Sequence, residues 1–221
     1  ETYDASSISV LEGLEAVRKR PGMYIGSTSR KGLNHLIYEI VDNAVDEHLA
    51  GYCDTIHVTL EADGSATVTD NGRGIPVGMH EKGVPAERLV FTTLHAGGVG
   101  SSVVNALSTY LDVQVSLGGW VYHDRYERGV AVQELDEDGL LPKIGKTKNS
   151  GTRINFLPDP EIFEKTRFSA TEVKSRLHET AYLNPALTIY FSDLRDGKEE
   201  HLTYHEPDGI VGFVRDLNKN K

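Results

Sequence analysis

A stripe of carboxylate, amide and imidazole side chains follows one stretch of the chain at four-residue spacing. His35, Glu39 and Asn43 repeat every four residues. Asp46 and Glu47 continue the stripe, so a helix here would present all five on one face. Oxygen ligands of this kind suit Mg²⁺, which keeps several waters and takes only one or two protein groups. A glutamate held by a neighbouring histidine is also suited to act as a general base toward water.

The alternative for this stripe is the solvated face of an ordinary amphipathic helix. Such a face usually mixes Lys and Arg with Glu, but histidine is the only basic residue type between His35 and Glu47. The residue types therefore favour a magnesium and water-activating site over a merely solvated face.

A second candidate site is the glycine-rich segment Asp70-Asn-Gly-Arg-Gly74. Gly72 and Gly74 follow a predicted strand and permit positive φ and a close backbone approach to a ligand. An ordinary turn is the alternative. The Rossmann fingerprint is absent, and Gly145-Lys146-Thr147 lacks a preceding glycine at the spacing of a Walker loop.

The elements that would position these residues follow from hydrophobic periodicity and capping signals. Strands bunched between helices, without strict alternation, favour one α+β layer structure over a doubly wound sheet. The aliphatic face of the 32–50 segment predicts the best helix, packed on the core. Capping boxes open the first and fifth helices at Ser9–Glu12 and Ser169–Glu172. Helices are predicted over 9–20, 32–50, 85–94, 101–107, 169–182 and 208–218, strands over 55–60, 66–69, 111–116, 121–126, 151–157, 187–192 and 201–204, and a charged loop over 134–148.

Length and charge limit the function classes. The 221 residues suit one large domain or two small ones. The net charge of −10 would repel DNA, so any nucleic acid is expected to be held by other domains or subunits. The single cysteine, Cys53, excludes a disulfide framework. No apolar run approaches the roughly 18 residues of a membrane span, and no leader opens the chain, so we expect a cytoplasmic protein without a membrane partner.

Taken together, the motifs resemble those of the GHKL ATPases. Residues 39–43 with Asp46 and Glu47 resemble the first motif, residues 70–74 the second, and residues 150–152 the last. Residues 14–26 (LEAVRKRPGMYIG) and 94–98 (LHAGG) resemble the ATPase domain of bacterial type II topoisomerases, the gyrase B and topoisomerase IV type. The resemblance covers nearly the whole chain. It implies a two-layer α/β sandwich, with a mixed sheet covered by helices on one face.

The resemblance also implies roles for single residues, with ATP and Mg²⁺ as cofactors. Glu39 would activate water for attack on the γ-phosphate, with His35 orienting it. Asn43 would hold Mg²⁺ at the phosphates. Asp70 would accept a hydrogen bond from the adenine amino group, supported by Thr152 through water. The other expected contacts are Gly74, which lets the backbone approach the base, Arg73 paired with Glu47 beside the pocket, the walls Ile75, Pro76, Val41 and Met79, and Gly100 at a helix N-terminus facing the phosphates.

Two positions depart from the family pattern. In the family a long lid separates the His-Ala-Gly-Gly run from the next helix, but here Val99 follows Gly98 directly. We interpret this as a deliberate deletion of the lid, with natural loop variation as the alternative. Leu117 stands where many relatives carry an arginine, so ligands reaching out of the adenine pocket would lose a cationic partner.

The resemblance finally implies the setting of the domain. Residues 1–221 correspond to a GHKL ATPase domain without the transducer domain that follows it in the family. We expect a monomer that binds ATP or ATP-competitive inhibitors but hydrolyses little. The intact protein would dimerise on ATP binding, meet the gyrase A subunit and DNA through other domains, and drive strand passage and negative supercoiling. The alternatives are the topoisomerase IV paralogue, which decatenates, a histidine-kinase or chaperone ATPase, and a non-catalytic nucleotide-sensing domain.

Overall fold

The computed structural model describes residues 13–94 and 100–219. Within these ranges nine strands form one mixed sheet, in the order β5-β4-β3-β7-β2-β1-β8-β9, with β6 paired to β4. The pair β1–β8 is parallel and its neighbours are antiparallel. The strands are β1 (Thr55–Leu60), β2 (Ala66–Asp70), β3 (Ser108–Leu117), β4 (Trp120–Glu127), β5 (Val130–Ala131), β6 (Lys143–Lys146), β7 (Gly151–Pro158), β8 (Thr188–Asp193) and β9 (Glu200–Tyr204).

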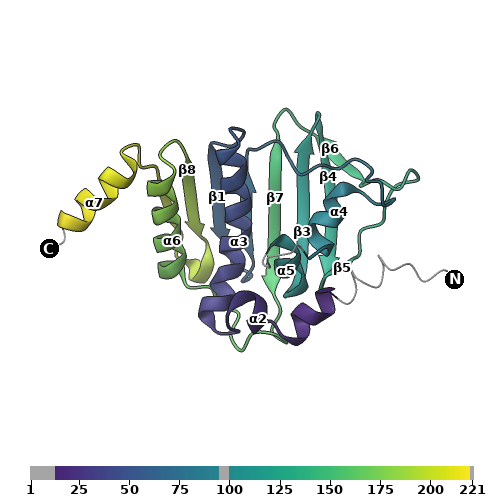
Figure 1. The fold of residues 1–221 in the computed structure, drawn as a ribbon, viewed down its shortest axis with the longest axis horizontal. Coiled ribbons are helices and arrows are strands. Elements are labelled where there is room, and N and C mark those ends of the chain that lie inside the picture. The colour runs from purple at the N-terminus through teal and green to yellow at the C-terminus, as the bar shows by residue number, and fades with distance from the viewer. Residues whose placement is uncertain (1–12, 95–99, 220–221) are drawn as a thin grey trace.

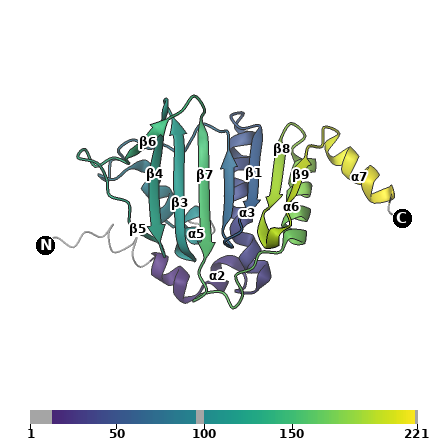
Figure 2. The ribbon, with the colours of Figure 1, turned by 180° about the vertical axis from the view of Figure 1, so that it is seen from behind.

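Helices cover one face of this sheet and leave the other face bare, as the two opposite views show (Figures 1 and 2). This arrangement confirms the predicted α+β, two-layer architecture. The last helix, α7, extends away from the sheet (Figure 1). The helices are α2 (Gly22–Ile25), α3 (Arg30–Leu49), α4 (Ala86–Thr92), α5 (Ser101–Ala106), α6 (Ala170–Leu183) and α7 (Gly209–Lys219), with a 3₁₀ turn at Arg195–Gly197 and an unlabelled helical stretch over 13–19.

The core forms where the aliphatic face of α3 meets the sheet. Leu33, Leu36 and Ile37 are each 0% exposed, as the periodicity predicts. Burial of one such side chain stabilises the fold by roughly 1.5–3 kcal/mol. The aliphatic face of α3 is fixed on the sheet. The polar stripe therefore lies on the other sides of the helix, which face α5 and the loop after β2.

Most predicted elements agree with the structure. Half of the predicted capping box of α6 is present: Ser169 Oγ accepts a hydrogen bond from the backbone N–H of Glu172, but the Ser169 N–H donates to Asn34 Oδ1 rather than to the Glu172 carboxylate. The predicted loop 134–148 is wrong in part, because β6 lies within it and extends the sheet beyond β4. The short elements α2 and β5 were not predicted, and the capping box at 9–12 lies outside the described residues.

Within the described part of the chain, no helix is long and apolar enough to cross a membrane. Cys53 is a free, buried thiol.

Candidate nucleotide site

A cavity of about 650 Å³ lies between the helical layer and the sheet. Its lining comes from α3, α4, the start of α5, the ends of β2, β3 and β7, and the loop after β2. The lining residues are Ile40, Asn43, Glu47, Val68, Asp70, Arg73, Gly74, Ile75, Pro76, Val90, Gly100, Ser101, Leu117, Thr152 and Ile154.

The polar stripe of α3 supplies part of the cavity lining. Asn43 lines it, and its Nδ2 donates to Ser101 Oγ at 2.6 Å, which ties α3 to α5. One turn earlier, Glu39 Oε1 lies 3.1 Å from His35 Nε2. The structure thus brings the histidine and glutamate together, as predicted. Neither of them is among the residues lining the cavity.

Another part of the lining is built where two antiparallel strands pair. Asp70 at the end of β2 lies opposite Thr152 on β7. The carboxylate of Asp70 accepts a hydrogen bond from the N–H of Gly72 at 2.8 Å. Burial raises the pKa of Asp70, while the N–H groups of Gly72 and Thr152 act against this rise. Thr152 Oγ1 accepts from the N–H of Ile75 at 3.2 Å, so the loop after β2 is fixed on β7.

Glu47 and Arg73 pair at the rim of the cavity, as predicted. The backbone N–H of Arg73 donates to Glu47 Oε2 at 2.9 Å, and its Nη2 donates to Oε1 at 2.6 Å. These hydrogen bonds lower the pKa of Glu47. The guanidinium also lies 3.8 Å from the centre of the Tyr52 ring.

The two glycines of the loop serve different needs. Gly74 has φ +88°, and a Cβ there would lie 2.9 Å from Ser116 O on β3. Gly72 does not have positive φ, but a Cβ on it would lie 2.7 Å from Glu47 Oε2. The loop therefore needs glycine to pack against β3 and α3. The prediction that Gly74 lets the backbone approach the adenine base is not tested by this packing and stays a prediction.

Two predicted wall residues are wrong. Val41 and its neighbour Ile40 are both 2% exposed, but only Ile40 lines the cavity, because successive residues of a helix point in different directions. Met79 is 49% exposed, does not line the cavity, and lies close to Gly139. The remaining predicted contacts Ile75, Pro76 and Gly100 do line the cavity.

Sequence reasoning also missed several lining residues. The available signal was the two-residue alternation of the strands. Val68 shares a face of β2 with Asp70, and Ile154 shares a face of β7 with Thr152, so each polar group carries an apolar neighbour into the cavity. Val90 and Ser101 enter from α4 and α5. Leu117, singled out as a departure, lines the cavity at the end of β3.

The donor set fits a magnesium ion held mainly by phosphates. Among the described residues, no group of three or more His, Cys, Asp or Glu side chains could hold a metal ion. The side-chain amide nitrogen of Asn43 donates to Ser101. This leaves the side-chain carbonyl oxygen of Asn43 as the acceptor at the cavity. One protein oxygen is a common complement for Mg²⁺ bound to phosphates and water.

The Gly145–Thr147 segment ends strand β6 and precedes no helix, consistent with the exclusion of a Walker loop.

Comparison with known proteins identifies the class. Residues 28–162 match the model of the histidine kinase-, DNA gyrase B- and HSP90-like ATPase family. The chain therefore belongs to this family of ATPases.

Within the family, the chain is similar to DNA gyrase B proteins. The gyrase B protein of Archaeoglobus fulgidus is 53% identical, over 99% of this chain and 36% of that protein. The gyrase B protein of Halalkalibacterium halodurans is 50% identical, over 100% of this chain and 36% of that protein. The B subunit of DNA topoisomerase 4 from Staphylococcus epidermidis is also a relative, at 48% identity over 99% and 35%.

A solved structure shows the same relationship. The 43K ATPase domain of Thermus thermophilus gyrase B, in complex with an aminocoumarin, superposes with a TM-score of 0.86 at 46% sequence identity. The superposition covers 96% of this chain and 56% of the Thermus chain. The chain thus spans about a third of the length of its gyrase B relatives. The gyrase B resemblance predicted from the motifs is confirmed.

Proposed function

We propose that this chain is the ATP-binding and ATP-hydrolysing domain of a type II DNA topoisomerase of the gyrase B type. The observation that carries the proposal is the single cavity that Asp70, Thr152 and Asn43 line together. In the whole protein, ATP binding would close a dimeric gate around DNA, and hydrolysis would reset it. The proposal includes the gyrase A subunit and DNA as partners and the cytoplasm as the location.

Asp70 is the residue for recognition of adenine. Its carboxylate is held by the N–H of Gly72 in a mostly apolar surrounding of Val68, Ile75 and Ile154. A buried acceptor discriminates strongly against ligands that lack the matching N–H donor. The Thr152 hydroxyl, fixed by Ile75, would support the base through water.

The triphosphate would extend toward Asn43 and the start of α5. Gly100 precedes α5, and its neighbour Ser101 is bonded to Asn43. The carbonyl oxygen of Asn43 would hold Mg²⁺, which neutralises phosphate charge when bound. Glu39, oriented by His35 at 3.1 Å, would accept the proton of the attacking water.

Nucleotide affinity and turnover are expected to be low in this chain. Val99 follows Gly98 directly, where the family carries a lid whose amides contact the triphosphate. The alignment with the Halalkalibacterium protein spans 238 positions against 221 residues here, so about 17 positions have no counterpart in this chain. A gap of this size is what the lid deletion predicts. Without the lid, the proposed domain would be a monomer that binds adenine-site inhibitors better than ATP.

Calorimetric titration tests the proposal. The ligands are a non-hydrolysable ATP analogue with Mg²⁺ and a compact heteroaromatic inhibitor that reaches only the adenine end. We expect tight binding of the inhibitor and weak binding of the analogue. Tight binding of the analogue would contradict the loss of the phosphate-binding lid. Binding of neither would contradict the adenine site itself.

The general base is tested in a longer protein that carries a full lid and the transducer domain. Glu39→Ala should abolish ATP hydrolysis and leave nucleotide binding within a few-fold of wild type. Hydrolysis that survives this change would favour a nucleotide-sensing domain in which the stripe of α3 is a solvated face. DNA relaxation, supercoiling and decatenation assays of the whole protein would separate the gyrase type from its topoisomerase IV paralogue.

A further inference from the structure

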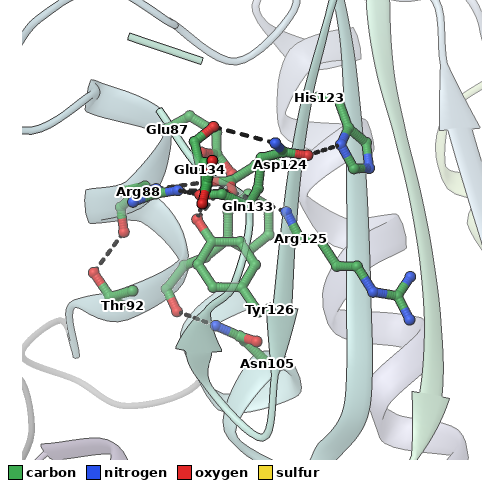
Figure 3. Close-up of polar contacts among 11 residues, drawn as sticks. Glu87, Arg88, Thr92, Asn105, His123, Asp124, Arg125, Tyr126, Gln133 and Glu134 are labelled. Carbon is green, nitrogen blue, oxygen red and sulfur yellow. Dashed lines mark hydrogen bonds and ion pairs between the residues drawn. The ribbon is translucent and has the colours of Figure 1, made fainter. Parts of the chain in front are cut away.

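A buried cluster of acidic side chains lies where α4 packs on β4, behind the wall of the cavity. Glu87, Asp124 and Tyr126 are each 0% exposed, and Figure 3 shows them beside Arg88. Tyr126 Oη lies 3.0 Å from Glu87 Oε1 and 2.9 Å from Asp124 Oδ2. Arg88 donates to both oxygens of Asp124, at 3.1 and 3.2 Å. Two carboxyl groups thus share one phenol, while the guanidinium of Arg88 binds only Asp124.

The hydrogen-bond count requires one additional proton. A phenol has one hydrogen and can donate it to only one of the two carboxyl groups. The second contact is a hydrogen bond only if a carboxyl carries a proton and donates it to the phenol oxygen. In that arrangement a chain of donors runs from one carboxyl, through Tyr126, to the other.

The proton belongs on Glu87 and the negative charge on Asp124. Asp124 accepts from Arg88 twice and from the N–H of Arg125 at 2.9 Å. Glu87 forms no ion pair within the described residues, and its Oε2 has no hydrogen-bond partner there. Burying an unpaired carbonyl oxygen of a neutral acid costs far less free energy than burying an unpaired, charged carboxylate oxygen.

The electrostatics agree with this count. Burial raises the pKa of Glu87 to about 10, and the neighbouring charge of Asp124 acts in the same direction. The other groups facing it are Tyr126, which lowers this pKa by its hydrogen bond, and Arg88, which lowers it by charge. Neither offsets the burial.

This cluster holds an element of the cavity wall. α4 has seven residues, and a helix so short is not stable without packing. Its Val90 lines the cavity, and the Phe91 carbonyl accepts from Asn105 Nδ2 of α5 at 2.9 Å. Phe91 also packs on Tyr126, with ring centres 5.6 Å apart. The placement of α4 on β4 therefore sets the position of Val90.

We propose that Glu87 is a positioning residue that acts as a neutral, proton-donating acid. In the chain Glu87–Tyr126–Asp124 it fixes α4 on β4 and holds Val90 in the cavity wall. The consequence for nucleotide binding rests on the function proposed above, whereas the proton and the anchoring of α4 do not.

The proton is tested by comparing wild type with Glu87→Gln across pH. The amide of glutamine can donate to the phenol oxygen without ionising, so this variant keeps the chain of donors. In wild type, Glu87 keeps its proton when folded and loses it on unfolding, so unfolding becomes easier as pH rises above about 4.3, the usual pKa of an unfolded glutamate. We expect the ratio of unfolding constants, wild type over Glu87→Gln, to rise by up to tenfold per pH unit between pH 6 and 9.

Urea unfolding at each pH gives these constants, with the exposed Glu137→Gln as the matched control. The ratio for Glu137→Gln should stay nearly constant over the same range. A constant ratio for Glu87→Gln as well would mean that Glu87 is ionised in the folded protein and would overturn the assignment of the proton.

The anchoring is tested by hydrogen exchange at pH 7, with the amides of β7 as internal reference. Glu87→Ala should speed exchange in α4 at least tenfold relative to β7, and Glu87→Gln should restore wild-type exchange. If Glu87→Ala does not fold, Tyr126→Phe breaks the same chain while keeping the ring that packs on Phe91. Unchanged α4 exchange in the folded variant would overturn the proposal.

Titration with ADP and Mg²⁺ adds the link to the cavity. We expect weaker binding by Glu87→Ala, or by Tyr126→Phe in its place, and binding within about twofold of wild type by Glu87→Gln. If wild type itself does not bind ADP, the proposed nucleotide function is in question, and the exchange and pH results still decide the role of Glu87.

Discussion

Glu47 on α3 and Arg73 in the loop after β2 are joined by both main-chain and side-chain hydrogen bonds across 26 residues of sequence. The backbone N–H of Arg73 fixes one carboxylate oxygen and the guanidinium binds the other. Because the Arg73 side chain also lies over Tyr52, the pair holds the loop at the rim of the cavity. This relationship gives the first prediction.

Arg73→Ala should destabilise the fold modestly and in a pH-dependent way. Hydrogen bonds from Arg73 lower the pKa of Glu47, so their stabilisation is present above the unfolded pKa of glutamate and is lost as pH falls through the lower, folded value. The pair is largely solvated, so we expect a small loss of stability at pH 7 that shrinks below about pH 4. Urea unfolding at pH 7 and pH 3.5 measures it. An equal loss at both values would mean that packing on Tyr52, not charge, is responsible.

Asp70→Asn should weaken binding of the compact adenine-site ligand at pH 7 without unfolding the domain. Loss of a hydrogen bond to a charged, buried acceptor costs about 1.5–3 kcal/mol, or roughly tenfold to a hundredfold in affinity. Burial raises the pKa of Asp70, so wild-type affinity should begin to fall at a higher pH than for an ordinary aspartate, whereas Asp70→Asn should show no such fall. Calorimetry between pH 4 and 8 measures both effects. Equal affinity of the two proteins would exclude Asp70 from the site.

The regular elements could be predicted because their signals are local. The aliphatic spacing of α3 and the helix-starting serine Ser169 each lie within one element, and both appear as expected. The β6 strand was missed because its lysines resemble a solvated loop. It forms because β4 offers an open edge for pairing, and this edge exists only in the folded sheet and not in the local sequence.

The site was predictable at its polar residues and less so at its walls. Asp70, Asn43 and Glu47 belong to motifs, whereas an apolar wall depends on the rotation of each element. A shift of one residue on α3 turns the side chain by about 100°, so Ile40 lines the cavity and the equally buried Val41 does not. The Glu87 cluster was not predicted, because Glu87 and Tyr126 lie 39 residues apart and meet only through packing.

Gly74→Ala should destabilise the domain by about 1–3 kcal/mol. The residue has φ +88°, and the new Cβ would lie 2.9 Å from Ser116 O and 3.0 Å from Val115 Cγ1 on β3. Because β3 is held in the middle of the sheet, it cannot move away cheaply. Gly78→Ala is the matched control, since nothing lies within 4 Å of its Cβ position and its φ is not positive. Thermal unfolding of the two variants measures the difference. A destabilisation by Gly78→Ala as large as that by Gly74→Ala would contradict the steric explanation.

Leu117→Arg should increase affinity for adenine-site ligands that carry a carboxylate on an extension toward the end of β3. Leu117 lines the cavity and lies directly opposite Trp120 across the turn of the β3–β4 hairpin. An arginine there would offer a planar fork of donors that matches a carboxylate.

At this partly solvated mouth, we expect a gain of about 1.4 kcal/mol, or tenfold in affinity, for the carboxylate ligand. The same ligand without its extension should bind wild type and Leu117→Arg equally. Leu117→Met, which changes shape but not charge, is the control for packing. Because this gain comes from a partly solvated ion pair, added salt should reduce it. A gain shared by Leu117→Met, or by the ligand without its extension, would show that shape rather than charge at residue 117 controls binding.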